Sequence, residues 1–268
     1  QKLKEELLSL DEDKLNDAFY TDLAFGTGGL RGVLGVGTNR MNIYTVQKAT
    51  YGFYQYLQEK YGNELQEKGM VISYDCRNYS YEFACASASV FGAAGVKVYL
   101  FSSLRPTPEL SFAVRELKCA GGIMITASHN PPEYNGYKVY DEDGCQLIPE
   151  LADVVIDKIS KINDLFNIPV GNFEELKAQN LIKMIDKEID DKYLEIVKTV
   201  PVQQVKKDNI KIVFTPLHGT ASVHLADLLK EEGYNVVEVK EQMIPDPFFS
   251  TVKSPNPEES TAFEYAIN

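Results

Sequence analysis

The stretch Gly122-Ile123-Met124-Ile125-Thr126-Ala127-Ser128-His129-Asn130-Pro131-Pro132 decides how this chain is organised, because it joins a short apolar run to a polar loop with two prolines. Such a run predicts a buried strand, and the loop after it places Ser128 at the tip of that strand. Asn135-Gly136 predicts a tight turn, since both central positions of such a turn need φ > 0. A further strand from Gly136 to Tyr140 would then carry Lys138 back toward Ser128.

The loop contains residues that suit nucleophilic chemistry. A serine hydroxyl is a weak nucleophile unless a base, a metal or electropositive surroundings activate it. His129 and Lys138 are the local candidates, and a lysine acts as a general base only if burial or nearby positive charge lowers its pKa toward neutrality. Arg31 and His129 could supply that charge. A plainer interpretation is a proline-stabilised connection in which Ser128 and Asn130 only satisfy their own backbone.

Strand and helix patterns alternate on both sides of this stretch. Apolar residues repeat at helical spacing from Ile43 to Tyr61, and Met70 to Tyr74 has the pattern of a buried strand. In a helix from Thr107 to Leu117 we expect Thr107 at the N-cap and Pro108 at the first position. The other expected helices cover 2–20 in two short pieces, 80–94, 149–162, 190–200 and 220–232; the other expected strands cover 96–101, 121–126, 210–215 and 235–239; and 163–180 is expected to be irregular. The alternation predicts α/β layer sandwiches with mostly parallel mixed sheets.

Several polar residues follow the expected strands. Asp75, Arg105 and Ser128 do so, and the carboxyl ends of strands are the usual ligand site of such sheets. Asp75 and Arg77 form either an ion pair that orders the floor of that site or a solvated turn, and we favour a structural role. Asp141-Glu142-Asp143-Gly144 is interpreted as a turn and not as a metal site.

The composition excludes several classes of protein. A chain of 268 residues with 44% apolar residues is long enough for two domains with cores of their own. The sequence has neither an apolar run of the ~20 residues that cross a bilayer nor a signal-peptide pattern, so we expect a cytoplasmic protein. The net charge of -12 argues against nucleic acid and anionic membranes as partners.

The cysteines and two of the histidines are expected to be structural or without a role. The cysteines are dispersed, lack the spacing of a zinc site and are expected as small core residues: Cys76, Cys85, Cys119 and Cys145. His218 lies where a strand meets a helix, and we interpret it as a hydrogen-bonded structural residue. His224 lies within an expected helix and is assigned no role.

Taken together, the motifs carry a family resemblance. Thr126-Ala127-Ser128-His129-Asn130-Pro131 with Asn135-Gly136-Tyr137-Lys138 resembles the phosphoserine loop of the α-D-phosphohexomutase superfamily, which includes phosphoglucomutases and phosphomannomutases. Further matches follow in family order: Phe25-Gly26-Thr27-Gly28-Gly29-Leu30-Arg31-Gly32, Tyr74-Asp75-Cys76-Arg77, Thr215-Pro216-Leu217-His218-Gly219-Thr220, and Pro245-Asp246-Pro247-Phe248-Phe249 with Pro255-Asn256-Pro257-Glu258. The resemblance spans almost the whole chain.

The resemblance implies a phosphoglucomutase-like isomerase, an intramolecular phosphotransferase of carbohydrate metabolism. Ser128 would carry a phosphate and donate it to a hexose monophosphate, which gives a bisphosphosugar that returns its other phosphate. Lys138 would be the general base and acid, and Arg31 and His129 would stabilise phosphate and the transition state. The expected phosphate-binding and substrate-binding residues are Thr27, Gly28, Arg31, Ser128, His129, Asn130 and Lys138. In an acidic protein these cations and the N–H groups of helix starts must create a local positive pocket.

The resemblance also implies cofactors and a domain plan. Mg²⁺ would be held by the phosphate on Ser128 and by three aspartates of an Asp-x-Asp-x-Asp-Arg loop in a third domain, and that loop is absent from this sequence. Glucose 1,6-bisphosphate would be the activator. We therefore expect the first part of a four-domain protein, with domain I over residues 1–188 and domain II plus the start of domain III over 189–268. Such a piece would lack full activity.

Alternatives remain open at this stage. The sugar could be that of a phosphomannomutase or a phosphopentomutase of the same superfamily, and the chain could be a non-catalytic module that binds a sugar phosphate. A serine hydrolase is disfavoured, because the sequence has no Gly-x-Ser-x-Gly elbow. A small phosphosugar is the expected partner, and the oligomeric state is left open.

Overall fold

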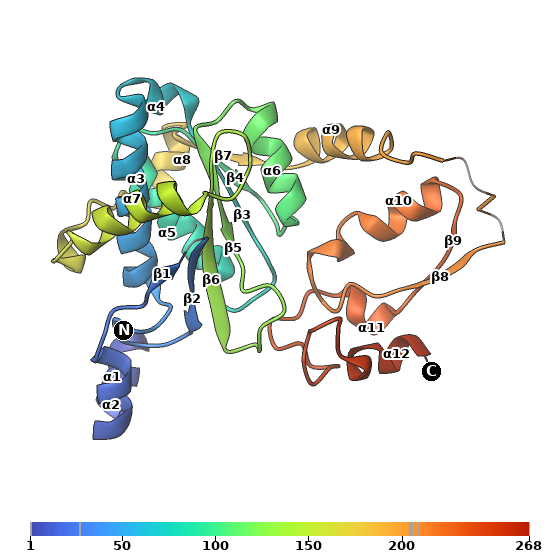
Figure 1. The fold of residues 1–268 in the computed structure, drawn as a ribbon, viewed down its shortest axis with the longest axis horizontal. Coiled ribbons are helices and arrows are strands. Elements are labelled where there is room, and N and C mark those ends of the chain that lie inside the picture. The colour runs from blue at the N-terminus through green and yellow to red at the C-terminus, as the bar shows by residue number, and fades with distance from the viewer. Residues whose placement is uncertain (1, 27, 204–205, 208, 268) are drawn as a thin grey trace.

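The chain folds into two α/β units, seen side by side in a computed structural model that describes residues 2–26, 28–203, 206–207 and 209–267 (Figure 1). Within these residues the first unit contains a seven-stranded sheet of order β1-β2-β6-β5-β3-β4-β7. Its strands are β1 (Phe25–Gly26), β2 (Gly29–Val33), β3 (Met70–Tyr74), β4 (Val98–Phe101), β5 (Gly121–Ile125), β6 (Tyr134–Tyr140) and β7 (Ile182–Ile185). The central strands β5, β3, β4 and β7 run parallel, whereas β6, β2 and β1 continue the sheet in antiparallel pairs.

Helices cover both faces of this sheet. The helices of this unit are α1 (Lys2–Ser9), α2 (Glu12–Phe19), α3 (Ile43–Tyr61), α4 (Glu64–Lys68), α5 (Ser80–Ala93), α6 (Thr107–Glu116), α7 (Pro149–Ser160), α8 (Phe173–Ala178) and α9 (Lys187–Val197), of which α1 and α2 project away from the sheet (Figure 1). Because side chains alternate along a strand, Ile72 of β3 enters the core cluster that contains Phe53 of α3 and Phe91 of α5. Val71 enters the opposite cluster with Leu110 of α6 and Ile189 of α9. The sheet is therefore buried on both faces, and its ligand sites must lie at strand ends.

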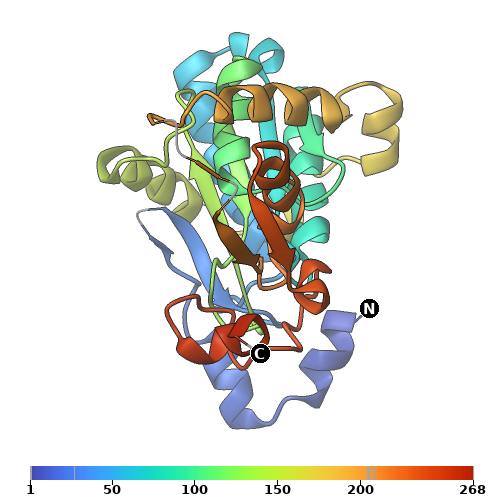
Figure 2. The same ribbon diagram turned by 90° about the vertical axis from the view of Figure 1, so that its right-hand side faces the viewer.

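The second unit is smaller. Its described strands β8 (Lys211–Phe214) and β9 (Asn235–Glu238) pair in parallel, and its helices are α10 (Leu225–Glu231), α11 (Lys240–Met243) and α12 (Glu264–Ile267). It lies on the side of the first sheet that carries α6 and α9 (Figure 1), and Figure 2, turned so that this side faces the viewer, shows it in front of the central strands. The fold class expected from the sequence is confirmed. The boundary between residues 188 and 189 stays a prediction.

The prediction of a turn at Asn135-Gly136 is wrong, because both residues lie inside β6. Gly136 pairs with Arg31 of β2, and a Cβ there would lie 2.4 Å from the carbonyl oxygen of Thr126. Asn135 is fully buried and donates to Asn78 O at 2.9 Å. Glycine is thus required by close strand packing, and the chain reverses earlier, where Tyr134 N donates to Pro131 O at 3.1 Å.

Smaller corrections concern element ends. Pro106 occupies the N-cap of α6, so Thr107 is the first helical residue. The expected irregular stretch contains α8, β7 was missed, and the expected helix over 220–232 is divided at His224, the N-cap of α10. Short elements such as these give too few residues for a periodicity to appear.

The structural interpretations of single residues have mixed outcomes. His218 is buried, with Nδ1 2.8 Å from Ile244 O and Nε2 2.7 Å from Thr251 Oγ1, which confirms its structural role. The turn at 141–144 is confirmed by Gly144 with a φ of +71°. Cys119 is buried as expected, but Cys145 is exposed. Among the described residues no helix combines the length and the apolarity that crossing a membrane requires.

Candidate active site

Ser128 stands exposed just beyond the end of β5. Its backbone takes the left-handed conformation, with a φ of +56°, and its N–H donates to Thr126 Oγ1 at 2.9 Å. Its Oγ lies 3.4 Å from Nδ1 of His129. A non-glycine residue with this backbone is uncommon and is kept only where its surroundings impose it. The loop over residues 126–132, here named the serine loop, thus presents the hydroxyl outward.

The surroundings that impose this conformation come from Arg77. Its side chain is buried, and its terminal nitrogens donate to four carbonyl oxygens of the serine loop and its exit. These are Ser128 O at 2.9 Å, Asn130 O at 2.5 Å, Pro131 O at 2.8 Å and Tyr134 O at 3.0 Å. A guanidinium offers its donors in a fixed planar fork, so one side chain holds the whole loop in shape.

Asp75 in turn holds Arg77 and Thr126 through hydrogen bonds. Its Oδ1 accepts from Arg77 N at 2.9 Å and from Ser80 Oγ at 2.7 Å, and its Oδ2 accepts from Thr126 Oγ1 at 2.5 Å. Oδ2 also lies 3.4 Å from Nε of Arg77. Burial raises the pKa of Asp75, while the hydrogen bonds from Thr126 and Arg77 oppose that rise. Asp75 and Arg77 are therefore a buried pair that orders the floor of the site, and the alternative of a solvated turn is wrong.

Lys138 reaches the same region from β6. The register pairs it with Met124 of β5 and with Gly29 of β2, so its side chain shares a sheet face with Arg31. Lys138 is half-buried. Burial, and next the positive charge of Arg31, lower the pKa of the Lys138 amine, and Asp75 opposes this.

A cleft of about 530 Å³ brings most of these groups together. Ser128, His129 and Lys138 line it, with Asp75 and Thr126 at its base. The opposite wall comes from the second unit and includes Phe214, Thr215, Pro216, Leu217, Gly219, Thr220, Phe249 and Phe263. The first unit therefore supplies the charged groups, and the second unit supplies apolar and backbone surface.

The other predicted residues are distributed around this cleft. Gly28 and Arg31 line an adjoining pocket of about 220 Å³, and Lys138 lines both spaces. Asn130 lies in the serine loop, and its Oδ1 is buried with no hydrogen-bond partner among the described residues. Thr27 lies outside the described residues. Among the described residues that line the cleft, His129 and Lys138 are those with basic side chains.

Comparisons with known proteins match this arrangement. The family described as phosphoglucomutase/phosphomannomutase, alpha/beta/alpha domain I, matches residues 22–165, and the corresponding domain II family matches residues 191–268. The chain belongs to the phosphoglucomutase/phosphomannomutase family. It is 40% identical over 250 residues to a phosphoglucomutase of Staphylococcus haemolyticus (strain JCSC1435), and 39% identical over 254 residues to one of Staphylococcus aureus (strain bovine RF122 / ET3-1).

These matches cover nearly all of this chain but less than half of each relative. They span 93% and 94% of the chain and 44% of each of the two phosphoglucomutases. The solved structure of a Thermus thermophilus protein assigned as a phosphomannomutase superposes with a TM-score of 0.73 at 27% identity, over 91% of this chain and 51% of that one. The expected organisation, with two family domains in family order, is therefore borne out.

Mg²⁺ is the ion that the family resemblance implies, and the described part of the cleft has few ligands for it. Asp75 provides the one carboxylate among the described residues that line the cleft. Both of its oxygens already accept hydrogen bonds, whereas Mg²⁺ demands near-octahedral oxygen coordination. The described residues that line the cleft do not form a Mg²⁺ site by themselves.

Sequence reasoning assigned no role to Phe249, although the motif that contains it was part of the family resemblance. Its ring lies 5.0 Å from the guanidinium carbon of Arg77, close enough for a cation–π contact, and Phe249 has a φ of +51°. Cys76 Sγ also contacts Asp246 O at 3.8 Å. Residues 246–249 of the second unit thus contact Cys76 and Arg77, next to the serine loop.

Proposed function

We propose that this chain carries the phosphoserine-bearing part of a phosphohexomutase that interconverts hexose 1-phosphate and hexose 6-phosphate, with glucose phosphates as substrates. The observation that carries the proposal is the exposed Ser128, held outward by buried Arg77 in the cleft that Lys138 also lines. The similarity to curated phosphoglucomutases supports the choice of glucose.

In this proposal Ser128 alternates between a phosphorylated and a free form. The bond between phosphorus and Ser128 Oγ breaks as a bond forms to a sugar hydroxyl, and the proton of that hydroxyl passes to the amine of Lys138. The resulting bisphosphosugar turns over in the cleft and returns its other phosphate to Ser128. The lowered pKa of Lys138 supports this role, because the shift favours the neutral amine that accepts a proton.

The remaining predicted residues bind and stabilise phosphate. His129 beside Ser128 Oγ and Arg31 beside Lys138 supply positive charge, and phosphoryl transfer depends mainly on such charge and on positioning. Thr27, Gly28 and Asn130 are proposed as phosphate-binding residues. The protein is proposed to work in the cytoplasm on small phosphosugars.

Mg²⁺ and glucose 1,6-bisphosphate are proposed as cofactor and activator. The ion would be held by the phosphate on Ser128 together with aspartates from a further domain, and it would neutralise charge on the phosphoryl group. The chain covers 44% of the phosphoglucomutases that it resembles. We therefore propose that the sequence is the first two domains of a longer enzyme and that these alone lack full activity.

A second candidate function is a module that binds a sugar phosphate without turnover. It is favoured by one observation, the lack of a Mg²⁺ ligand set among the described cleft residues. Exposing the isolated chain to labelled glucose 1,6-bisphosphate with Mg²⁺ separates the two candidates. Label that is mapped to Ser128 excludes a purely binding role.

The decisive test uses the longer protein that includes this chain. Labelled glucose 1,6-bisphosphate should phosphorylate Ser128, as peptide mapping by mass spectrometry would show, and Ser128→Ala should abolish both label and mutase activity. Near-normal turnover in Ser128→Ala would overturn the mechanism. Parallel assays with the phosphates of glucose, mannose and ribose would decide the sugar.

A further inference from the structure

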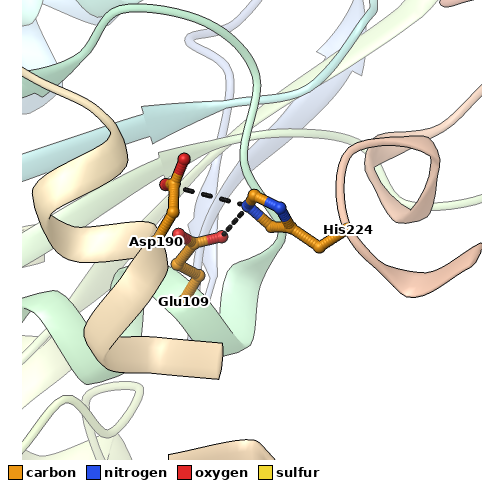
Figure 3. Close-up of side chains that lie close together, drawn as sticks. All are labelled: Glu109, Asp190 and His224. Atoms are coloured by element: carbon orange, nitrogen blue, oxygen red, sulfur yellow. Dashed lines mark ion pairs between the residues drawn. The ribbon is translucent and has the colours of Figure 1, made fainter. Parts of the chain in front are cut away.

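Three helices bring two carboxylates and a histidine together outside the cleft that Ser128 lines. Glu109 lies in the first turn of α6, Asp190 lies in α9, and His224 is the N-cap of α10 in the second unit. Figure 3 shows the three side chains pointing toward one another from these elements. Nε2 of His224 lies 3.4 Å from Glu109 Oε2 and 3.7 Å from Asp190 Oδ1, and one ligand atom from each residue lies within 4.8 Å of the others.

Glu109 lacks the hydrogen bonds that a buried carboxylate needs, although His224 and Arg105 lie within ion-pair distance of its oxygens. Its side chain is 0% exposed, and neither of its oxygens has a hydrogen-bond partner in the described part of the chain. Nε2 of His224 is buried without a hydrogen-bond partner as well. An unpaired polar group in a protein interior costs about 1–3 kcal/mol, and an unpaired charge costs more. The Glu109 carboxylate and Nε2 of His224 point toward one another, so a single bound ligand could contact both.

The distances distinguish a shared metal ion from a direct hydrogen bond. Charge-assisted hydrogen bonds between nitrogen and oxygen have lengths of about 2.7–2.9 Å. Nitrogen and oxygen atoms that share one tetrahedral ion at about 2.0–2.2 Å lie about 3.3–3.6 Å apart. The observed 3.4 Å between His224 and Glu109 falls within the second range, and the 3.7 Å between His224 and Asp190 lies just above it.

Arg105 supplies the outer support of this cluster. It donates to both oxygens of Asp190 at 2.8 Å, and its Nε lies 3.8 Å from Glu109 Oε1. Carboxylates that bind metal ions are commonly held by such outer hydrogen bonds, which orient the ligand. One positive charge in Arg105 also leaves the two carboxylates with a net negative charge that a divalent cation can neutralise.

We propose that Glu109, Asp190 and His224 bind one divalent transition-metal ion of the Zn²⁺ type. An imidazole with two carboxylates is a donor set that suits Zn²⁺ better than Mg²⁺, and water completes the tetrahedron. The site is distinct from the Mg²⁺ position expected at Ser128. Because it joins α6 and α9 to α10, the ion would fix the separation of the two cleft walls, to which Thr107 and Leu225 belong.

The test measures metal binding directly on the chain with Cys145→Ser, since the exposed thiol of Cys145 would bind Zn²⁺ by itself. Zn²⁺ is titrated against a chromophoric chelator, and Co²⁺ is added separately as a spectroscopic probe. We expect one Zn²⁺ per chain and a Co²⁺ spectrum typical of tetrahedral nitrogen and oxygen ligands. His224→Gln and Glu109→Gln should weaken Zn²⁺ binding at least about tenfold.

Asp227→Asn is the matched control, because Asp227 lies on the same helix as the cluster but is 78% exposed. It should bind Zn²⁺ like the parent chain. Failure of the parent chain to bind Zn²⁺ in a one-to-one ratio overturns the proposal, whatever the variants do. Unchanged binding in His224→Gln overturns it too, and circular dichroism of each metal-free variant checks that the fold is retained.

Discussion

The carboxylates of Asp75 and Glu109 are both buried and follow neighbouring strands of the first sheet, yet their surroundings are opposite. Each oxygen of Asp75 accepts a hydrogen bond from Thr126, Ser80 or Arg77. Neither oxygen of Glu109 accepts one within the described residues, although Arg105 lies 3.8 Å away. The two sites therefore contain the same chemical group in a satisfied and an unsatisfied state.

This difference in hydrogen bonding separates the Asp75 site, which positions Ser128, from the Glu109 site, for which we propose metal binding. A buried polar network in which both carboxylate oxygens accept hydrogen bonds is rigid, and here its product is the fixed conformation of Ser128. A buried carboxylate without hydrogen bonds either takes up a proton or is compensated by an additional ligand, and burial raises the pKa of Glu109. Substitutions at the two sites should consequently have different costs.

The largest expected effect comes from removing the arginine of the satisfied site. Arg77→Ala leaves four loop carbonyls without donors and leaves Asp75 without its cation. We expect a loss of about 3–5 kcal/mol in the free energy of unfolding, the cost of breaking a buried charge pair. Urea denaturation followed by circular dichroism measures this loss.

Arg115→Ala is the control for that measurement, because Arg115 is exposed and its two hydrogen bonds are both 3.3 Å long. Its effect should stay within about 0.5 kcal/mol. Equal effects of the two substitutions would mean that Arg77 does not hold the serine loop.

A smaller loss is expected where the same region packs backbone against backbone. Gly136→Ala places a methyl group 2.4 Å from Thr126 O and 3.0 Å from Leu30 O. Overpacking of this kind costs about 1–3 kcal/mol. Gly62→Ala, at a position with nothing within 4 Å but a φ of +54°, separates packing cost from backbone cost in the same unfolding experiment. A neutral Gly136→Ala would show that β6 can move away from its neighbours.

Gly136 also illustrates what the sequence could and could not predict. The strands and helices with long apolar patterns were predicted closely, because periodicity is a local property: α3 and β3 have the expected bounds. The dipeptide Asn135-Gly136 has the local signature of a turn, but two neighbouring strands decide its conformation. Tertiary contacts of this kind leave no trace in the local pattern.

The same limit applies to the candidate site. Ser128, His129 and Lys138 were predicted together, because a single loop and the following strand carry them. The support by Arg77 was only one of two interpretations, since its four acceptors are backbone carbonyls that any sequence provides. His224 was assigned no role, because Glu109 and Asp190 lie far from it in the sequence and meet it only through the packing of three helices.

A third substitution compares the two carboxylates directly. In the presence of a chelator, Glu109→Gln removes a buried carboxyl group that accepts no hydrogen bond within the described residues, so the free energy of unfolding should stay equal or rise by about 1 kcal/mol. Asp75→Asn, the same change of chemistry at the satisfied site, should instead destabilise by about 3 kcal/mol or more. Similar losses at both positions in urea denaturation would contradict the distinction between the two sites.

The smallest expected effect concerns Lys138, whose side chain is half-buried, unlike the buried carboxylates of Asp75 and Glu109. Burial lowers its pKa first and Arg31 second, so Arg31→Gln removes one cause and moves that pKa back toward the ordinary value of about 10.4. If the neutral amine accepts the proton, the acid limb of the kcat/KM profile for mutase activity shifts to higher pH in the longer protein that includes this chain.

The pH dependence of the free energy of unfolding gives an independent measure of the Lys138 pKa, because it does not require catalytic activity. A lysine whose pKa is lowered by folding stabilises the protein above its unfolded pKa, and this contribution is lost as the pH falls through the folded pKa. Below its folded pKa the charged Lys138 is therefore a cost, which Arg31→Gln should reduce slightly, and the difference should vanish above about pH 10.4. Thermal melts across that range measure it, with Lys138→Met as the variant in which Arg31→Gln should have no pH-dependent effect. A shift that persists in Lys138→Met would assign the titration to another group.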